Sequence, residues 1–156
     1  IHDEAQPFQV VTQRQTVQDI GTHFNIEAYP EDSLAKTTLL EGAARVVLDE
    51  GGESRLVYPG EQALVNRQIR IRKADTTEVV AWKNGQFVFR STSLRHIMQQ
   101  IARWYDVDVV YENDVSGKSV WGSVSRYADV SEVLKLIELT GVAHFKTSGR
   151  KIIVTQ

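Results

Sequence analysis

Side chains that could carry out chemistry are few in this sequence, and they are not grouped. The chain has no cysteine, which excludes a disulfide framework, a thiolate metal site and a cysteine nucleophile. No histidine has a second histidine four residues away or a carboxylate at metal-ligand spacing, so each is expected to be an isolated side chain. We therefore predict no metal site and no cofactor. The histidines are His2, His23, His96 and His144.

Four carboxylates between residues 106 and 114 have some likeness to a calcium-binding loop. An EF-hand loop requires an acidic or amide residue and then glycine at its fifth and sixth positions, where this sequence has Val110 and Tyr111. The alternation of charged and apolar residues predicts a half-buried strand instead. The sequence also has no nucleophile elbow, dinucleotide fingerprint or Walker loop. An enzyme is therefore the function class with the least support.

The composition is that of a folded domain. Of 156 residues, 42% are hydrophobic and 24% are charged, and the net charge is −2. The longest apolar run, Val79–Trp82, is far shorter than the about 20 residues of a membrane-spanning helix. The only basic cluster is Arg67, Arg70, Arg72 and Lys73, which has no aromatic residue within it and is expected to be a solvated or pairing face rather than a nucleic-acid platform.

Residues 1–85 consist of short apolar segments separated by turn residues. This pattern predicts an all-β sandwich or roll with no helix before Gly85. In one segment, alternation predicts that Ile69 and Ile71 point inward while Arg70 and Arg72 point outward. The expected strands are 8–11, 24–28, 37–40, 44–48, 55–58, 69–72 and 78–81.

Residues 86–156 show a different period. Apolar residues from Leu94 to Tyr105 and from Val130 to Ile137 follow helical spacing, with strands predicted before and after each helix. Ser93 or Thr92 is expected to cap the first helix, and Gly141 to end the second. When the sequence is aligned with itself at an offset of 36 residues, the apolar positions of the two predicted helices coincide, and Val88 aligns with Val124. We therefore predict two βαβ units in tandem that share one core.

The predicted fold class is α+β, with an all-β domain at 1–85 and a duplicated βαβ domain at 86–156. Five segments of the first domain resemble the FecR family, membrane-anchored anti-sigma regulators of cell-surface signalling in Gram-negative bacteria. Phe89, Leu94 and the segment 102–107 resemble the domain that closes many FecR-like proteins, which is similar to the secretin and TonB N-terminal (STN) module. The five segments are Pro7–Val11, Ile20–Ile26, Leu39–Gly42, Pro59–Gln62 and Trp82–Phe87.

The resemblance covers nearly the whole chain and implies a periplasmic region of a single-pass inner-membrane protein. It implies that the signalling domain of an outer-membrane TonB-dependent transporter binds here, and that an extracytoplasmic-function (ECF) sigma factor binds a cytosolic segment not present in this sequence. The sigma-binding segment, the membrane helix and further strands would precede Ile1, which leaves the first strand with an open edge. No nucleic-acid or membrane contact is expected for this region itself.

Two kinds of site follow from the resemblance. In some FecR-like proteins a Gly-Thr pair cleaves itself, and Gly21 and Thr22 occupy that position; we interpret the pair as structural because no general base is evident. A partner strand would add at an open sheet edge, for which the strands Lys151–Val154 and Val120–Val124 are the candidates. The predicted partner-binding residues are Val120, Trp121, Tyr127, Lys151 and Ile153, whereas Trp104 and Tyr105 are expected in the core.

Two other function classes remain open at this stage. Exposed aromatic residues such as Tyr29, Tyr58 and Trp82 could form a stacking platform in a small-ligand or glycan-binding module. Alternatively, the chain could be a structural assembly module of the secretin type, which would form rings or multimers.

Overall fold

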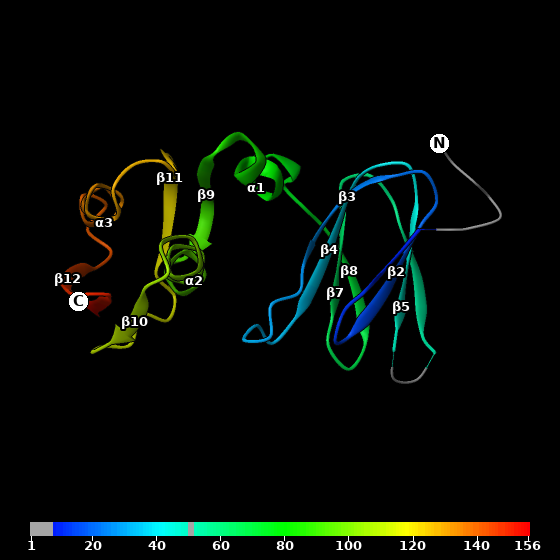
Figure 1. Cartoon of the computed structure of the whole chain (residues 1–156), viewed down its shortest axis with the longest axis horizontal. Coiled ribbons are helices and arrows are strands. Elements are labelled where there is room, and N and C mark those ends of the chain that lie inside the picture. Colours follow the sequence, from blue (N-terminus) through cyan, green and yellow to red (C-terminus); the bar gives the residue numbers. More distant parts are fainter. Residues whose placement is uncertain (1–7, 50–51) are drawn as a thin grey trace. The chain divides into compact units, whose positions relative to one another are not determined.

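The structure is a computed structural model that describes residues 8–49 and 52–156, with Asp19 described by its backbone alone. The chain divides into two compact units, residues 1–80 and residues 81–156 (Figure 1). The sequence-based boundary was placed slightly later, after Gly85. His2 and Pro7 lie outside the described residues.

The first unit consists of two four-stranded antiparallel sheets. One has the strand order β1-β2-β5-β6 and the other β3-β4-β7-β8. The predicted α+β class, with its β-rich first part, is confirmed, although β2 and β7 were not among the expected strands. The strands are β1 (Gln9–Val11), β2 (Gln15–Asp19), β3 (His23–Glu27), β4 (Ala35–Glu41), β5 (Ala44–Leu48), β6 (Ser54–Val57), β7 (Glu61–Val65) and β8 (Ile69–Lys73).

The core of the first unit takes side chains from both sheets. Val17 and Val46 of one sheet and Leu39 and Val65 of the other are fully buried in a single cluster. Burial of each such side chain contributes about 1.5–3 kcal/mol to folding. The two sheets therefore depend on each other for stability.

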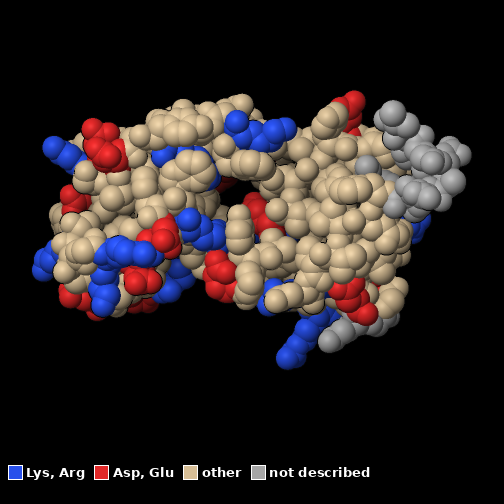
Figure 2. All heavy atoms as spheres, viewed as in Figure 1, with Lys and Arg blue, Asp and Glu red and all other residues tan. Residues whose placement is uncertain are grey.

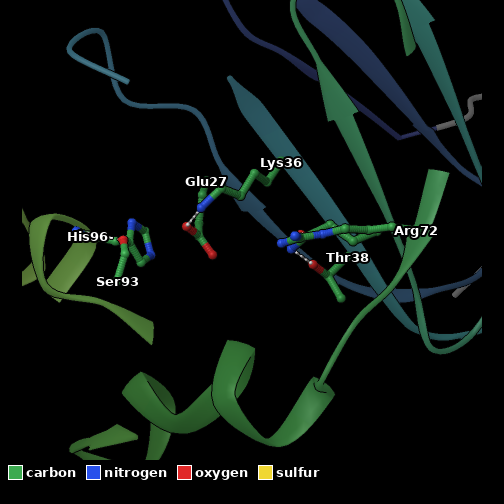
Figure 3. A network of polar contacts seen from close by, with 7 residues as sticks. Glu27, Lys36, Thr38, Arg72, Ser93 and His96 are labelled. Atoms are coloured by element: carbon green, nitrogen blue, oxygen red, sulfur yellow. Dashed lines mark hydrogen bonds and ion pairs between the residues drawn. The ribbon is translucent and has the colours of Figure 1, made fainter. Parts of the chain in front are cut away.

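Buried glutamines bond to neighbouring threonines of β4. Gln15 Nε2 donates to Thr37 Oγ1 at 2.8 Å, and Gln62 Nε2 donates to Thr38 Oγ1 at 2.7 Å. The Arg72 guanidinium donates twice to Gln62 Oε1, at 2.7 and 3.0 Å. Figure 3 shows Arg72 and Thr38 together with the Glu27–Lys36 ion pair, whose length is 3.4 Å. These bonds satisfy buried polar groups that would otherwise be costly, although Gln15 Oε1 has no hydrogen-bond partner among the described residues.

Two expectations for the end of the first unit are wrong. Residues 78–81 are not a strand, because helix α1 (Thr76–Val80) and the 3-10 helix η1 (Ala81–Asn84) occupy this region. Asp75 Oδ1 accepts hydrogen bonds from the N–H groups of Thr77 and Glu78, at 3.0 and 3.2 Å, and so caps the helix. In addition, Ile71 is 37% exposed, because it lies on the edge strand β8 beyond the well-packed part of the core.

The second unit contains two helices and two separate sheets. One sheet pairs β9 with β11, and the other has the order β10-β13-β12. Its core takes side chains from both sheets and both helices, including Phe87, Ile97, Ile137 and Ile152. The elements are β9 (Gln86–Ser93), α2 (Leu94–Tyr105), β10 (Asp108–Tyr111), β11 (Ser119–Ser125), α3 (Val130–Glu138), β12 (His144–Ser148) and β13 (Lys151–Thr155).

The two helices lie where their apolar spacing predicts. Ser93 Oγ accepts the His96 N–H at 3.3 Å and caps α2, as Figure 3 also shows, whereas the Asp129 side chain makes no such bond for α3. The order strand-helix-strand occurs twice along the chain, but β9 and β10 lie in different sheets, as do β11 and β12. Each strand-helix-strand segment therefore connects the two sheets instead of completing one of them.

Candidate docking edge

The structure separates the five residues predicted to bind a partner. Val120 is buried, whereas Trp121 is 69% exposed and Tyr127 is 81% exposed. Val120 and Trp121 lie in β11, and Tyr127 follows the end of that strand. Lys151 and Ile153 belong to β13, in the other sheet.

The prediction that residues 151–154 form an edge strand is wrong. β13 is the central strand of its sheet, paired in parallel with β10 and antiparallel with β12. Its N–H and C=O groups are used on both sides, so it cannot accept a further strand. Lys151 and Ile153 therefore belong to a sheet face rather than to a docking edge.

β11 is an edge strand, as expected, with β9 as its single neighbour. The Arg126 N–H donates to the Gly85 carbonyl at 2.8 Å, just beyond the end of this ladder. Bonded and non-bonded pairs alternate along an antiparallel ladder. The N–H and C=O groups of Trp121 and Ser123 therefore point away from β9, toward the open side.

Other edges of the second unit are partly covered by their own side chains. On β9, Thr92 Oγ1 accepts the Arg90 N–H at 3.0 Å, and Arg126 Nε donates to the Gln86 carbonyl at 3.1 Å. On β12, Glu138 Oε1 accepts the Phe145 N–H at 2.8 Å. Among the described residues no side chain bonds in this way to the open edge of β11 or of β10. Covered edges resist strand addition, whereas uncovered ones permit it.

A β-bulge shapes the start of the β11 edge. The register shifts between Val120 and Trp121, opposite Ser91, which has a left-handed φ of 59°. The extra residue is Ser91 of β9, and it allows Thr92 to point into the core opposite Val120. Trp121 is exposed because side chains alternate along β11, in which Val120 and Val124 face the core.

A second exposed aromatic group lies at the other end of β11. The rings of Trp104 and Tyr127 meet edge to face at 6.4 Å, and Trp104 Nε1 donates to the Arg126 carbonyl at 2.7 Å. The Arg126 guanidinium lies 4.3 Å from the Phe87 ring centroid and 5.0 Å from that of Trp104. The expectation of a core position for Trp104 is wrong, because this side chain is 44% exposed.

Two further contacts hold this aromatic group in place. Gly85 has φ +66°, and a Cβ atom there would lie 2.4 Å from the Tyr127 ring, so any other residue would be strained and would have to displace that ring. Tyr105 is partly buried, and its hydroxyl donates to the Ala128 carbonyl at 2.7 Å. Burial, followed by the charge of Asp129, raises the pKa of Tyr105, so this hydroxyl stays protonated and able to donate. A rigid exposed aromatic group is typical of binding hot spots.

The Gly21–Thr22 pair lies in the turn between β2 and β3. Gly21 has φ +75°, and a Cβ atom at Gly42 would lie 2.5 Å from the Gly21 carbonyl oxygen. His23, the next residue, is bonded through Nδ1 to Glu41 Oε2 at 2.9 Å. The sequence analysis did not identify this imidazole as a potential base. The close approach explains Gly42 as a packing requirement, and the left-handed φ of Gly21 explains the glycine there.

Two of the aromatic residues suggested for ligand stacking, Tyr29 and Tyr58, do not lie together. Ala35 pairs with Val65 and Thr38 with Gln62, so the β3–β4 loop with Tyr29 and the β6–β7 turn with Tyr58 lie at opposite ends of their sheet. Trp82 belongs to the second unit. Within residues 8–49 and 52–156, no group of three or more histidine and carboxylate side chains could hold a metal ion.

Comparison with known proteins identifies close relatives of the fold. Residues 86–154 match the family model described as FecR, C-terminal. Two crystal structures of a putative anti-sigma factor from Parabacteroides distasonis match 100% of this chain and 74% of their own, with 26% identity and TM-scores of 0.85 and 0.84. No curated protein matches the sequence.

Proposed function

On the premise that residues 86–154 match the FecR C-terminal family, we propose that the chain is a region of a FecR-like anti-sigma factor and receives a signal by accepting a strand of a partner protein at β11. None of its described helices is long and apolar enough to cross a membrane. The proposed location is the periplasm. The proposed partner is the signalling domain of an outer-membrane TonB-dependent transporter, and the proposed output is control of an ECF sigma factor.

The observation that supports this proposal is the open edge of β11. Its outward N–H and C=O groups lie between Trp121 at one end and the Trp104–Tyr127 pair at the other. A partner strand would form main-chain hydrogen bonds along the edge, and its side chains would contact the aromatic rings at both ends. Such contacts provide both affinity and register.

The relay requires only that the partner prefer one state of the regulator. To shift a two-state equilibrium from 1:99 to 99:1, the preference must be about 5.5 kcal/mol. A signalling contact of standard size buries about 1,200–2,000 Å² and can supply free energy of this order when its central aromatic residues are well packed. In this proposal the chain forms and breaks no covalent bond.

Ser123→Pro tests the docking edge. The Ser123 N–H points away from β9, so proline removes an edge donor and adds a bulky ring without removing a bond of the native ladder. Binding of the signalling domains of TonB-dependent transporters encoded near this gene would be measured by isothermal titration calorimetry. We expect the variant to bind at least about tenfold more weakly than the natural sequence, a loss of about 1.4 kcal/mol.

Thr147→Pro is the matched control. Since the Phe145 N–H points outward to Glu138, the alternation along β12 makes the Thr147 N–H point outward as well. This variant is expected to bind as the natural sequence does. Equal weakening by both substitutions would contradict docking at β11. A rise in melting temperature with sugars or siderophores would favour a ligand-binding module, and rings of purified protein would favour an assembly module.

For Gly21 and Thr22 we propose a structural role without self-cleavage. Intact-mass spectrometry of the full-length protein is expected to give a single chain. Two fragments that separate between these residues, and that disappear in the Thr22→Ala variant, would show that the pair is reactive.

A further inference from the structure

The two uncovered edges of the second unit differ in charge. Figure 2 shows side chains of both signs on the face of this unit in view, so the strands have to be compared one by one. The segments 86–93 and 115–128, which contain β9 and β11, carry Arg90, Lys118 and Arg126 and no carboxylate. The segment 106–114, which contains β10, carries four carboxylates and no cation.

The charges near β11 belong to the same sheet as the docking edge. Arg90 lies opposite Trp121 in the ladder, and its side chain is exposed. Lys118 directly precedes β11, whereas the Arg126 guanidinium lies toward the outer side of β9, where its Nε donates to the Gln86 carbonyl. A strand added at β11 would lie about 5 Å from β11 and about 10 Å from β9. These distances are comparable to the Debye length of about 8 Å at physiological salt, so Lys118 and Arg90 act on the added strand, and Arg126 acts on it less.

These charges discriminate between occupants. A second copy that paired its own β11 with this edge would bring the Lys118 and Arg90 side chains of both copies toward one another, with no carboxylate on either β11 or β9, and like charges that approach one another are destabilising. A strand rich in aspartate and glutamate would meet complementary charge instead, which increases both affinity and association rate. We therefore infer that the partner docks an acidic strand at β11. This inference rests on the proposed function and adds the chemistry of the partner.

Two short peptides test the charge preference directly. One alternates glutamate with valine and the other alternates lysine with valine, so both have the same strand propensity and opposite charge. Each would be titrated into the ¹⁵N-labelled chain while amide resonances are followed by NMR. We expect the acidic peptide to shift the amides of Trp121 and Ser123 and the Trp121 indole, at a concentration at least about tenfold below that of any response to the basic peptide.

Three controls complete the experiment. Ser123→Pro is expected to remove the response to the acidic peptide, and Arg90→Glu to weaken it, with the remaining resonances of both variants unchanged as evidence of an intact fold. Raising the salt concentration from about 50 to 500 mM is expected to weaken the response.

Several outcomes would overturn the inference. These are an equal response of β11 to both peptides, a response confined to Val109 and Tyr111 of β10, no response to the acidic peptide, or shifts of β11 amides with protein concentration alone, which would identify a second copy. The calorimetric experiment with transporter domains is independent of these peptides. A transporter domain that binds the natural sequence but not Ser123→Pro would therefore support the docking edge even where the charge preference fails.

Discussion

The strands β11 and β13 look alike in sequence but have opposite places in the second unit. Both are short segments rich in β-branched residues, and both were predicted to be edges. β11 has one neighbour and an open side, whereas β13 lies between β10 and β12. The last strand in the sequence is thus not necessarily an edge strand of its sheet. Strand order is decided by pairing between distant segments, such as Asp108–Tyr111 with Lys151–Val154.

The difference in position has a direct consequence for function. β13 contributes Ile152 and Val154 to the core, and all its main-chain groups serve the sheet. In β11, Val120 alone is fully buried, and the exposed Trp121 and Ser123 face the open side. One strand stabilises the unit and the other is available to a partner.

Proline substitution gives the largest expected effect and tests this comparison. Because the Phe145 N–H points away from β13, Lys146 and Ile153 form a bonded pair, so Ile153→Pro removes a ladder bond from a central strand. We expect it to lower the free energy of unfolding by more than about 3 kcal/mol. Ser123→Pro should cost less than about 1 kcal/mol, since it removes no native bond. Urea denaturation followed by circular dichroism measures both, and equal losses would contradict the assignment of edge and centre.

The elements that the sequence predicted well are those with a strong local signal. The apolar spacing of α2 and its cap at Ser93 were sufficient to predict this helix. Its four apolar residues Leu94, Ile97, Met98 and Ile101 are all buried. Helix α1 was missed although Asp75 and Glu78 have the spacing of a capping box, because the apolar residues that follow suggested a strand.

The missed strands have a different cause. β2 and β7 carry Gln15 and Gln62 at buried positions, where a hydrophobic pattern expects apolar residues. Each glutamine is accommodated by a bond to a threonine on β4, which is more than 20 residues distant for both. No local pattern encodes such pairing. The assignment of β2 and β7 therefore depends on hydrogen bonds between residues that are distant in the sequence.

The second prediction concerns the aromatic residue at the start of the edge. Trp121→Ala should weaken binding of the transporter signalling domain by about 2 kcal/mol, or roughly 30-fold, because large aromatic residues dominate interface energies. The free energy of unfolding should change by less than about 0.5 kcal/mol, since the side chain is 69% exposed. Leu139→Ala, at a residue 77% exposed that directly follows α3, is the control and should leave binding unchanged. Equal effects of the two substitutions would show that Trp121 is no anchor.

The site itself was only partly predictable from the sequence. Trp121 and Tyr127 were named correctly as exposed, because aromatic residues beside a predicted edge stand out. The roles of Trp104 and Arg126 were not foreseen, since the Trp104 spacing on α2 did not reveal that its ring lies against residues 22 and 23 positions later. These contacts depend on how α2 and β11 pack, which no local signal specifies.

The third prediction tests the aromatic group at the other end of β11. Gly85→Ala should cost about 1–2 kcal/mol for its left-handed φ and more for displacing the Tyr127 ring. Gly117→Ala is the matched control, because Gly117 has φ +75° and no atom near the position of an added Cβ. The excess cost of Gly85→Ala over Gly117→Ala measures how firmly Tyr127 is held. Chemical denaturation gives both values, and an excess of zero would mean that Tyr127 moves freely.

The smallest effect concerns alkaline pH and the hydroxyl of Tyr105. Burial, then the charge of Asp129, raises its pKa above the ordinary value of 10.0, so the folded state binds this proton more tightly than the unfolded state. The resulting stability is fully present below about pH 10 and is lost as the pH rises through the folded pKa. Tyr105→Phe should cost about 1 kcal/mol at neutral pH, through loss of the bond to Ala128, and should lose less stability above pH 10. Burial also raises the pKa of Tyr111, so the loss of stability above pH 10 should become smaller in the Tyr105→Phe variant but should not disappear. Urea denaturation between pH 7 and 11 measures this slope, and an unchanged slope in the variant would mean that Tyr105 does not anchor the end of the docking edge through its protonated hydroxyl.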